Sequence, residues 1–188
     1  TFAMIKIYCK ILKKKTIKIG YDTKFTLDTQ KLYKNINSKV SLIIISNPNS
    51  PTGTVLNLNE IKKILEKAKK YKIKVVIDEA YFGFSLVTAC PLIKRYKNLI
   101  VLRTFSKAYG LAGLRIGYAI SNPANIEELT NIKPMYEVNS LAILGANILL
   151  NNEHYRKKYL KEVLDGKKEL INFFFMKQIS FLKSEGNF

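Results

Sequence analysis

Apolar and polar residues alternate along the chain in blocks that predict strands separated by helices. Residues 40–46 form an almost continuous apolar run of strand length, which is typical of a strand covered on both faces. Shorter apolar runs follow at 74–77 and 99–102, and a fourth strand is expected over 114–120. Because helical patterns separate the strands, the sequence predicts an α/β fold with a mainly parallel sheet flanked by helices.

Three helices are expected where apolar residues recur at helical spacing. Residues 57–71 place apolar side chains on one face and most of their lysines on the other, and Asn57 or Asn59 could act as the N-cap. Two further helices are expected at about 139–150 and 153–178. The last one carries an uninterrupted apolar stripe, which predicts that it packs against the core.

Polar segments follow each of the first three predicted strands. They are the turn 47–53 (NPNSPTG), the pair Asp78-Glu79 and the segment 104–107 (TFSK). Ligands of open α/β sheets bind at the carboxyl ends of the strands. The sequence therefore predicts a ligand site at this edge of the sheet.

Length and charge limit the kind of protein that this chain can be. Its 188 residues, 47% of them hydrophobic, are enough for one well-buried domain. It has 32 basic and 14 acidic residues, a formal net charge of +18 that could attract nucleic acid or anionic lipid. However, the lysines are spread over the whole chain, which favours a solvated basic surface. We therefore expect no specific nucleic-acid partner.

The sequence gives no sign of a membrane span, a secretory signal or a metal site. It contains no apolar run of about eighteen residues, and its first residues lack the layout of a signal peptide. Cys9 and Cys90 form neither a CxxC motif nor part of a metal-type cluster. We expect a reduced, cytoplasmic setting, with no metal and no membrane partner.

The segment after the third strand combines a lysine with groups suited to a phosphate. Lys107 is preceded by two hydroxyl side chains, Thr104 and Ser106, and a glycine-containing stretch with Arg115 follows it. Hydroxyl donors and a guanidinium fork suit a phosphate. A lysine beside that phosphate can form a Schiff base with an aldehyde.

Asp78 ends the second strand, where a buried carboxylate is costly unless it has a charged partner. The protonated ring nitrogen of a pyridine-type cofactor would be such a partner, and a loop cap or N-cap is the alternative role. Tyr81, three residues on, could donate a hydrogen bond to an oxygen of the ligand. Its alternative is a half-buried tyrosine at the edge of the core.

Three linked motifs resemble the cofactor motifs of class I/II aminotransferases of fold type I, and most closely those of the histidinol-phosphate aminotransferase branch. They are NPNSPTG at 47–53, VVIDEAYFGF at 75–84 and TFSKAYGLAGLRIGY at 104–118. The resemblance implies the large domain of that fold and pyridoxal 5'-phosphate as the cofactor. It also implies transfer of an amino group between an amino acid or amino phosphate, such as histidinol phosphate, and a 2-oxo acid.

The resemblance further implies a role for each matching residue. Lys107 would form the Schiff base with the cofactor and then act as the base that moves a proton. Asp78 would pair with the pyridine nitrogen, and Tyr81 would contact the phenolate oxygen. The phosphate would be held by three residues, Thr104, Ser106 and Arg115.

Three other positions bear on the site through this resemblance. Phe2 falls where a ring-stacking aromatic, often tyrosine, is found, and it keeps the stacking but lacks the hydroxyl. Ser50 stands directly before PTG, where asparagine is frequent, so either Asn49 or Ser50 would contact the phenolate oxygen. Glu137 lies where a neutral amide is common, so the sequence does not fix the amino donor.

The resemblance also implies how the chain is divided. Residues 1–183 would belong to the cofactor-binding large domain, whose N-terminal part precedes residue 1, and 184–188 would begin a C-terminal small domain. Family members are homodimers that build their active sites at the subunit interface. We therefore expect this chain by itself to have little or no activity.

Two alternatives to an aminotransferase remain on the residues. One is a pyridoxal-phosphate decarboxylase or lyase of the same fold, because the same cofactor residues serve several reactions. The other is a non-catalytic module that binds its partner through the basic surface. Such a module has no need of Lys107, Asp78 and Arg115 together, which favours an enzyme.

Overall fold

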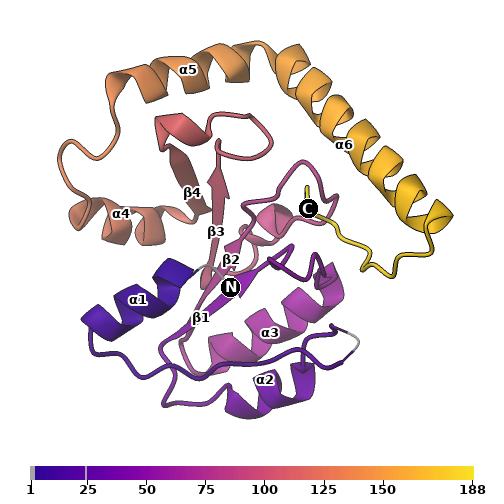
Figure 1. Ribbon diagram of the computed structural model, residues 1–188. Coiled ribbons are helices and arrows are strands. Elements are labelled where there is room, and N and C mark those ends of the chain that lie inside the picture. Colours follow the sequence, from indigo (N-terminus) through magenta and orange to yellow (C-terminus); the bar gives the residue numbers. More distant parts are fainter. Residues whose placement is uncertain (1–2, 24) are drawn as a thin grey trace.

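The computed structural model describes residues 3–23 and 25–188, which fold around a four-stranded sheet (Figure 1). The strands lie in the order β1-β2-β3-β4. The pairs β1-β2 and β2-β3 are parallel, and β4 is antiparallel to β3. The bounds are Leu42–Ser46 for β1, Lys74–Asp78 for β2, Leu99–Thr104 for β3 and Gly117–Ser121 for β4. The mainly parallel α/β sheet predicted from the sequence is confirmed.

β4 starts at Gly117 rather than at residue 114, where the sequence placed it. A short 3-10 helix (η2, Ala112–Leu114) and Arg115, with a left-handed φ of 54°, come first. The chain returns from β3 without a crossover helix, which gives an antiparallel pair. Gly117 permits the close approach of the two strands, because a Cβ there would lie 2.7 Å from the carbonyl oxygen of Arg103.

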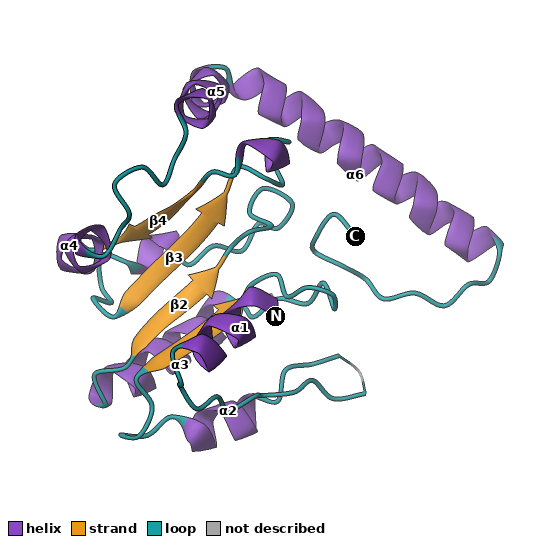
Figure 2. Cartoon of the chain, turned by 60° about the vertical axis from the view of Figure 1, so that its left-hand side comes forward, coloured by secondary structure: helices purple, strands orange, loops and turns teal. Residues whose placement is uncertain are grey.

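Six α-helices accompany the sheet in the described residues (Figures 1 and 2). Three of them, α3, α5 and α6, agree with the expected ranges to within two residues at each end. None of the described helices is both long enough and apolar enough to cross a membrane. The bounds are Ala3–Ile11 for α1, Thr29–Asn35 for α2, Leu58–Lys70 for α3, Pro123–Asn131 for α4, Ser140–Asn151 for α5 and Glu153–Met176 for α6.

The helices α1, α2 and α4 were not predicted from the sequence. α4 carries a clear start signal, since Asn122 caps the helix and Pro123 occupies its first turn. α2 is only seven residues long, and Asp28 caps it by accepting a hydrogen bond from the Lys31 N–H at 2.8 Å. α1 has no buried residue, so its apolar positions do not belong to the core of the described chain.

α3 forms because its first turn and its apolar face are both well specified. Asn57 accepts hydrogen bonds from the N–H groups of Asn59 and Glu60, and the Glu60 carboxylate accepts one from the Asn57 N–H at 2.8 Å. This reciprocal arrangement is a capping box. The apolar face is fully buried against the sheet, as predicted, through Ile61, Ile64, Leu65 and Ala68.

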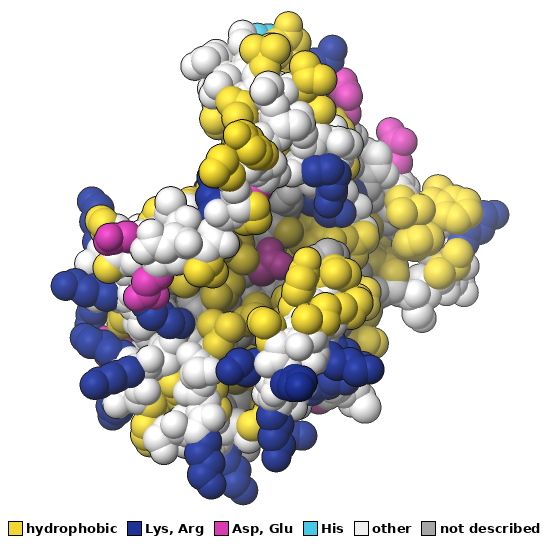
Figure 3. Space-filling view, turned by 90° about the vertical axis from the view of Figure 1, so that its left-hand side faces the viewer, with side chains coloured by type: hydrophobic (Ala, Val, Ile, Leu, Met, Phe, Trp, Pro, Cys, Tyr) yellow, Lys and Arg dark blue, Asp and Glu magenta, His cyan; other side chains and the backbone are white. Residues whose placement is uncertain are grey.

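The two faces of the sheet are covered unequally. Val75 and Ile77 of β2 are fully buried in the core that includes α3, whereas the alternate residues of β2 are only half-buried. On that second face, Leu42 is 47% and Leu102 is 37% exposed, so the expectation that β1 is covered on both faces is wrong for the described chain. Viewed from the side of α1, this region is hollowed and lined largely by hydrophobic side chains (Figure 3).

α6 packs against the core only near its N-terminal end. Leu160 is buried against Phe84 and Ala108, which agrees with the predicted apolar stripe. Farther on, Leu170 is 51% and Phe175 is 68% exposed, so the prediction of core packing is wrong for the second half. Figure 2 shows the reason, because α6 runs away from the sheet.

Candidate active site

The polar segments that follow β1, β2 and β3 meet at one edge of the sheet. Ser46 is in register with Asp78, and Asp78 with Leu102. The ladder continues past the strand ends, because the Asn47 N–H donates to the Asp78 carbonyl and the Glu79 N–H to the Leu102 carbonyl, both at 2.8 Å. This register confirms that the three segments lie together at the carboxyl ends of the strands.

Asp78 lies half-buried at the end of β2, on the face of the sheet away from α3. Its Oδ1 accepts a hydrogen bond from the Ala80 N–H at 3.1 Å. Burial raises the pKa of Asp78 above its ordinary value, and the Ala80 hydrogen bond opposes that shift. A desolvated carboxylate of this kind is stabilised by a cation placed against it. The contact with Ala80 is also one that a turn-capping aspartate makes.

Lys107 and Tyr81 lie near each other at this edge, as expected. The Nζ of Lys107 is 5.5 Å from the centroid of the Tyr81 ring. On either side of Lys107, Phe105 and Ala108 are buried, and the Phe105 ring packs 4.6 Å from the ring of Tyr109. These buried neighbours anchor the turn, so the half-buried lysine is held in a defined place.

The hydroxyls of Thr104 and Ser106 come together, while Arg115 lies apart from them. The two Oγ atoms are 2.9 Å apart, and the Ser106 N–H donates to Thr104 Oγ1 at 3.1 Å. Thr104 Oγ1 also lies 3.3 Å from the carbonyl oxygen of Ile116, close in sequence to Arg115. The exposed guanidinium of Arg115 donates to the Ala112 carbonyl at 2.7 Å. The structure thus shows the hydroxyl pair but does not bring the guanidinium onto it.

The two candidates in the NPNSPTG turn have different surroundings. Asn49 is buried and its amide donates to Thr52 Oγ1 at 2.8 Å, so it stabilises the turn from within. Ser50 is half-buried beside it. Asn47, which the sequence analysis did not single out, also braces the turn through two hydrogen bonds to the backbone of Leu56, at 2.7 and 3.2 Å. Phe2 lies outside the described residues.

The segment 184–188 lies against the same turn. The Glu185 N–H donates to the Gly53 carbonyl at 2.8 Å, and Lys167 of α6 donates to the carbonyls of Ser184 and Gly186, both at 2.6 Å. The ring of Phe188 packs edge-on against Tyr81, with the centroids 4.9 Å apart. No pattern in the sequence links this segment to the turn, because the link depends on where α6 ends.

Replacing Gly53 by alanine should destabilise the full-length protein and displace the segment 184–188. Gly53 has a left-handed φ of 69°, and a Cβ there would lie 2.3 Å from Ser184 Oγ and 2.5 Å from its Cα. The backbone strain alone is expected to cost about 1–3 kcal/mol. Urea unfolding should show a lower midpoint than for Gly20→Ala, since a Cβ at Gly20 meets nothing within 4 Å. Equal midpoints for the two variants would contradict this packing.

Two charged residues next to the predicted site were given no role from the sequence. Glu79 follows Asp78 directly and is buried, and Arg103 precedes Thr104 and forms an ion pair with Glu79. Their pairing becomes visible only once the strand register is known. When Asp78 is aligned with Leu102, the acidic residue after one strand stands opposite the basic residue at the end of the next.

The fold defines an α/β protein with a candidate ligand site at the carboxyl ends of its strands. The family model for class I and II aminotransferases matches residues 1–188. The chain therefore belongs to this family. This membership confirms the resemblance found in the sequence and the prediction of pyridoxal 5'-phosphate as the cofactor.

Similar proteins agree with this assignment. Histidinol-phosphate aminotransferase 1 of Carboxydothermus hydrogenoformans is 34% identical over 189 residues, which cover 100% of this chain and 53% of that protein. A dihydroxyacetone phosphate transaminase of Campylobacter jejuni is 37% identical over 159 residues, covering 84% of this chain and 43% of that protein. The crystal structure of the histidinol-phosphate aminotransferase from Clostridium acetobutylicum has the same fold, with a TM-score of 0.89 and 24% identity over 99% of this chain and 57% of that one. The chain thus spans about half the length of these proteins.

Proposed function

We propose that the full-length protein transfers amino groups and uses Lys107, Asp78 and Tyr81 around pyridoxal 5'-phosphate. The observation that carries the proposal is the position of Asp78. Its partly desolvated carboxylate stands at the strand end next to the turn that presents Lys107. A protonated ring nitrogen is a cation that such a carboxylate would stabilise, so the residues present fit the cofactor.

When bound, pyridoxal phosphate supplies an aldehyde that takes up an amino group and a ring that accepts electrons. In our proposal Asp78 keeps the proton on the ring nitrogen. Lys107 would hold the cofactor covalently, and its amine would afterwards take the proton from the substrate's α-carbon and return it to the carbon of the cofactor's former aldehyde. Tyr81 donates a hydrogen bond from its hydroxyl to the phenolate oxygen.

The phosphate end of the cofactor would lie against the turn after β3. The paired hydroxyls of Thr104 and Ser106 offer two short donors. Arg115 is exposed, and its guanidinium would turn from the Ala112 carbonyl towards the phosphate. Asn49 or Ser50 would make the second contact to the phenolate oxygen, and the Asn49 amide also donates inside its own turn.

We propose a phosphate-bearing amino donor, such as histidinol phosphate, and a 2-oxo acid acceptor. The names of two relatives, a histidinol-phosphate aminotransferase and a dihydroxyacetone phosphate transaminase, both describe phosphorylated substrates. Glu137, which departs from the family pattern, forms an ion pair with Lys133 at 3.0 Å. Lys133 thereby offsets the extra negative charge of Glu137.

The experiment that tests this function separates transfer from decarboxylation. Full-length protein loaded with pyridoxal 5'-phosphate would be incubated with histidinol phosphate and a 2-oxo acid, and then with the donor alone. We expect a new amino acid to form from the 2-oxo acid without release of carbon dioxide. Carbon dioxide release from amino-acid substrates without an amino acceptor would instead identify the decarboxylase alternative.

We further propose that residues 1–183 form most of the cofactor-binding domain of a cytoplasmic enzyme, with 184–188 leading into a small domain. We expect the full-length protein to be a homodimer. Apolar side chains exposed on α5 support an interface at that helix, namely Leu141, Ile143, Leu144, Ile148 and Leu150. Sedimentation of the full-length protein should give the mass of a dimer, and a monomer at micromolar concentration would contradict this.

The basic surface remains the feature that would support a binding module. Four lysines and an arginine line an open groove beside α3, together with Glu66: Lys62, Lys63, Lys67, Lys70 and Arg95. Lysine charge of this kind attracts nucleic acid without reading its sequence, and the attraction falls steeply with salt. That there is no specific nucleic-acid partner stays a prediction.

A further inference from the structure

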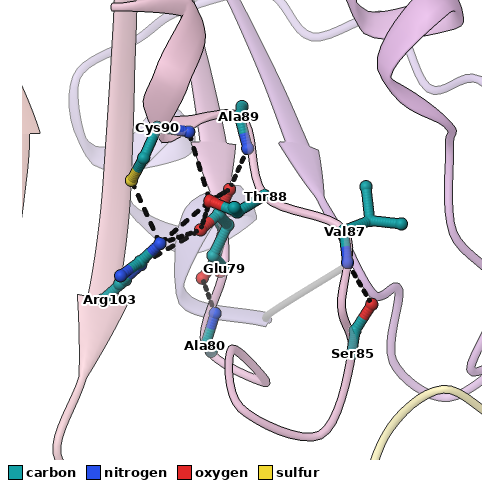
Figure 4. A network of polar contacts seen from close by, with 9 residues as sticks. Glu79, Ala80, Ser85, Val87, Thr88, Ala89, Cys90 and Arg103 are labelled. Carbon is teal, nitrogen blue, oxygen red and sulfur yellow. Dashed lines mark hydrogen bonds and ion pairs between the residues drawn. The ribbon is translucent and has the colours of Figure 1, made fainter.

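Glu79, the residue after Asp78, forms a buried ion pair with Arg103 (Figure 4). Glu79 is only 1% exposed. The Nε and Nη2 atoms of Arg103 both lie 3.0 Å from its Oε2 atom. Both nitrogens approach the same carboxylate oxygen, and the Nε–H donates a charge-assisted hydrogen bond to it.

The polar groups around this pair are satisfied from several directions. Thr88 Oγ1 lies 2.9 and 3.0 Å from the two carboxylate oxygens of Glu79, and the Ala89 N–H donates to Oε1 at 2.6 Å. Arg103 Nη2 also donates to Thr88 Oγ1 at 2.9 Å and to Cys90 Sγ at 3.1 Å. The network therefore ties the loop after β2 to the ends of two neighbouring strands, as Figure 4 shows.

The register places this pair at the ends of β2 and β3, beside Asp78 and Thr104 of the candidate site. Asp78 is aligned with Leu102, so the next residues along the two strands, Glu79 and Arg103, stand opposite each other. Successive side chains of a strand point to opposite faces. Glu79 and Arg103 therefore face the α3 side, while Asp78 and Thr104 face the other.

The ion pair also affects the balance of charge at two consecutive carboxylates, Asp78 and Glu79. Arg103 compensates Glu79, so the Asp78 carboxylate does not meet an uncompensated negative charge directly behind it. Without that compensation, a like charge next to Asp78 would oppose its ionisation further. A buried ion pair often contributes little net stability compared with apolar residues of the same size, whereas removal of one partner is costly. We infer that the main effect of this pair is to fix the end of β2 against the end of β3.

We propose that Glu79 and Arg103 are positioning residues of the cofactor site, whose ion pair fixes the end of β2 against the end of β3 and thereby sets where Asp78 stands relative to Lys107. This inference rests on the proposed function. It concerns two residues that act through Asp78 and Lys107 and do not touch the ligand.

The test compares two Glu→Gln variants of the full-length protein. Glu79→Gln removes the buried charge, and Glu66→Gln is the matched control, because Glu66 pairs with Arg95 on the surface at 3.4 Å. Pyridoxal 5'-phosphate is titrated into each protein at a temperature where urea unfolding shows both to be folded. For Glu79→Gln we expect the Kd to rise roughly ten- to a hundredfold, the range seen when partners of metal ligands are removed. The induced circular dichroism of the bound cofactor should change as well, and Glu66→Gln should match the unmodified protein.

Each result of the titration supports or overturns the proposed role of the ion pair. A Glu79→Gln protein with a lower unfolding midpoint but an unchanged Kd and circular dichroism would show a purely structural pair and overturn the inference. If Glu79→Gln does not fold, Thr88→Val replaces it, since this change removes the bridging hydroxyl and leaves both charges. A smaller shift in the same direction is then expected, and unchanged values would reject the inference. If the unmodified protein does not bind pyridoxal 5'-phosphate, the proposed function itself fails.

Discussion

Replacing Lys107 by alanine in the full-length protein should lower amino-group transfer by several orders of magnitude. The chain has many lysines, but Lys107 is the one held between buried Phe105 and Ala108, near the Tyr81 ring. Its loss removes both the covalent attachment of the cofactor and the group that moves the proton. Turnover with a 2-oxo acid measures the effect, and Lys94→Ala, an exposed lysine, serves as the control.

The same lysine is identified independently of activity by chemical trapping. Borohydride reduction of the loaded protein followed by peptide mapping should find the cofactor on Lys107. An adduct on a different lysine, or full turnover by Lys107→Ala, would refute the assignment.

Replacing Asp78 should cost nearly as much activity while leaving the cofactor partly bound. Asp78→Ala removes the carboxylate that we place against the ring nitrogen, so turnover should fall by several orders of magnitude. Asp78→Glu should recover part of the rate, because the charge survives on a longer side chain. If Asp78 were only a turn cap for Ala80, Asp78→Asn would keep most of the activity, and Asp78→Ala would cost stability of about 1 kcal/mol.

Stability provides a second way to separate these two roles of Asp78. Burial raises its pKa in the folded protein, so without a bound cation the folded state gains stability from protonation at low pH. That gain is lost as the pH rises through the raised pKa. Before pyridoxal 5'-phosphate is added, Asp78→Asn should therefore be at least as stable as the unmodified protein near neutral pH, although it is inactive. A loss of about 1 kcal/mol in Asp78→Ala but not in Asp78→Asn, whose amide oxygen can still accept the Ala80 hydrogen bond, would favour the capping role.

The local features of the fold were predictable because each depends on neighbouring residues. The apolar runs in the sequence predicted β1, β2 and β3, which are buried on one face. The cap and the apolar face of α3 are likewise formed by residues close together in the sequence. The carboxyl-edge position of the polar segments followed from parallel pairing. The cofactor motifs could then be placed at that edge before any contact was known.

What could not be predicted depends on contacts between distant residues. The contact of Glu185 with Gly53 spans most of the chain, and it is fixed by the length and direction of α6. The Glu79–Arg103 pair required the exact alignment of β2 with β3. The exposed second half of α6 was misread because an apolar stripe indicates that a surface will be covered, but not by which part of a protein.

Because the two faces of the sheet are covered unequally, successive residues of β2 lie in two different environments. Val75, Ile77 and Glu79 face the core, where a substitution changes how firmly the protein holds together. Val76 and Asp78 face the hollowed side, where we expect a substitution of Asp78 to change what the protein can do. A slip of β2 by one residue would exchange these assignments, turning Glu79 towards the site and Asp78 towards Arg103. If Asp78 acts as proposed, strand register becomes a condition for activity, because Asp78 and Glu79 carry the same charge but point to opposite faces of the sheet.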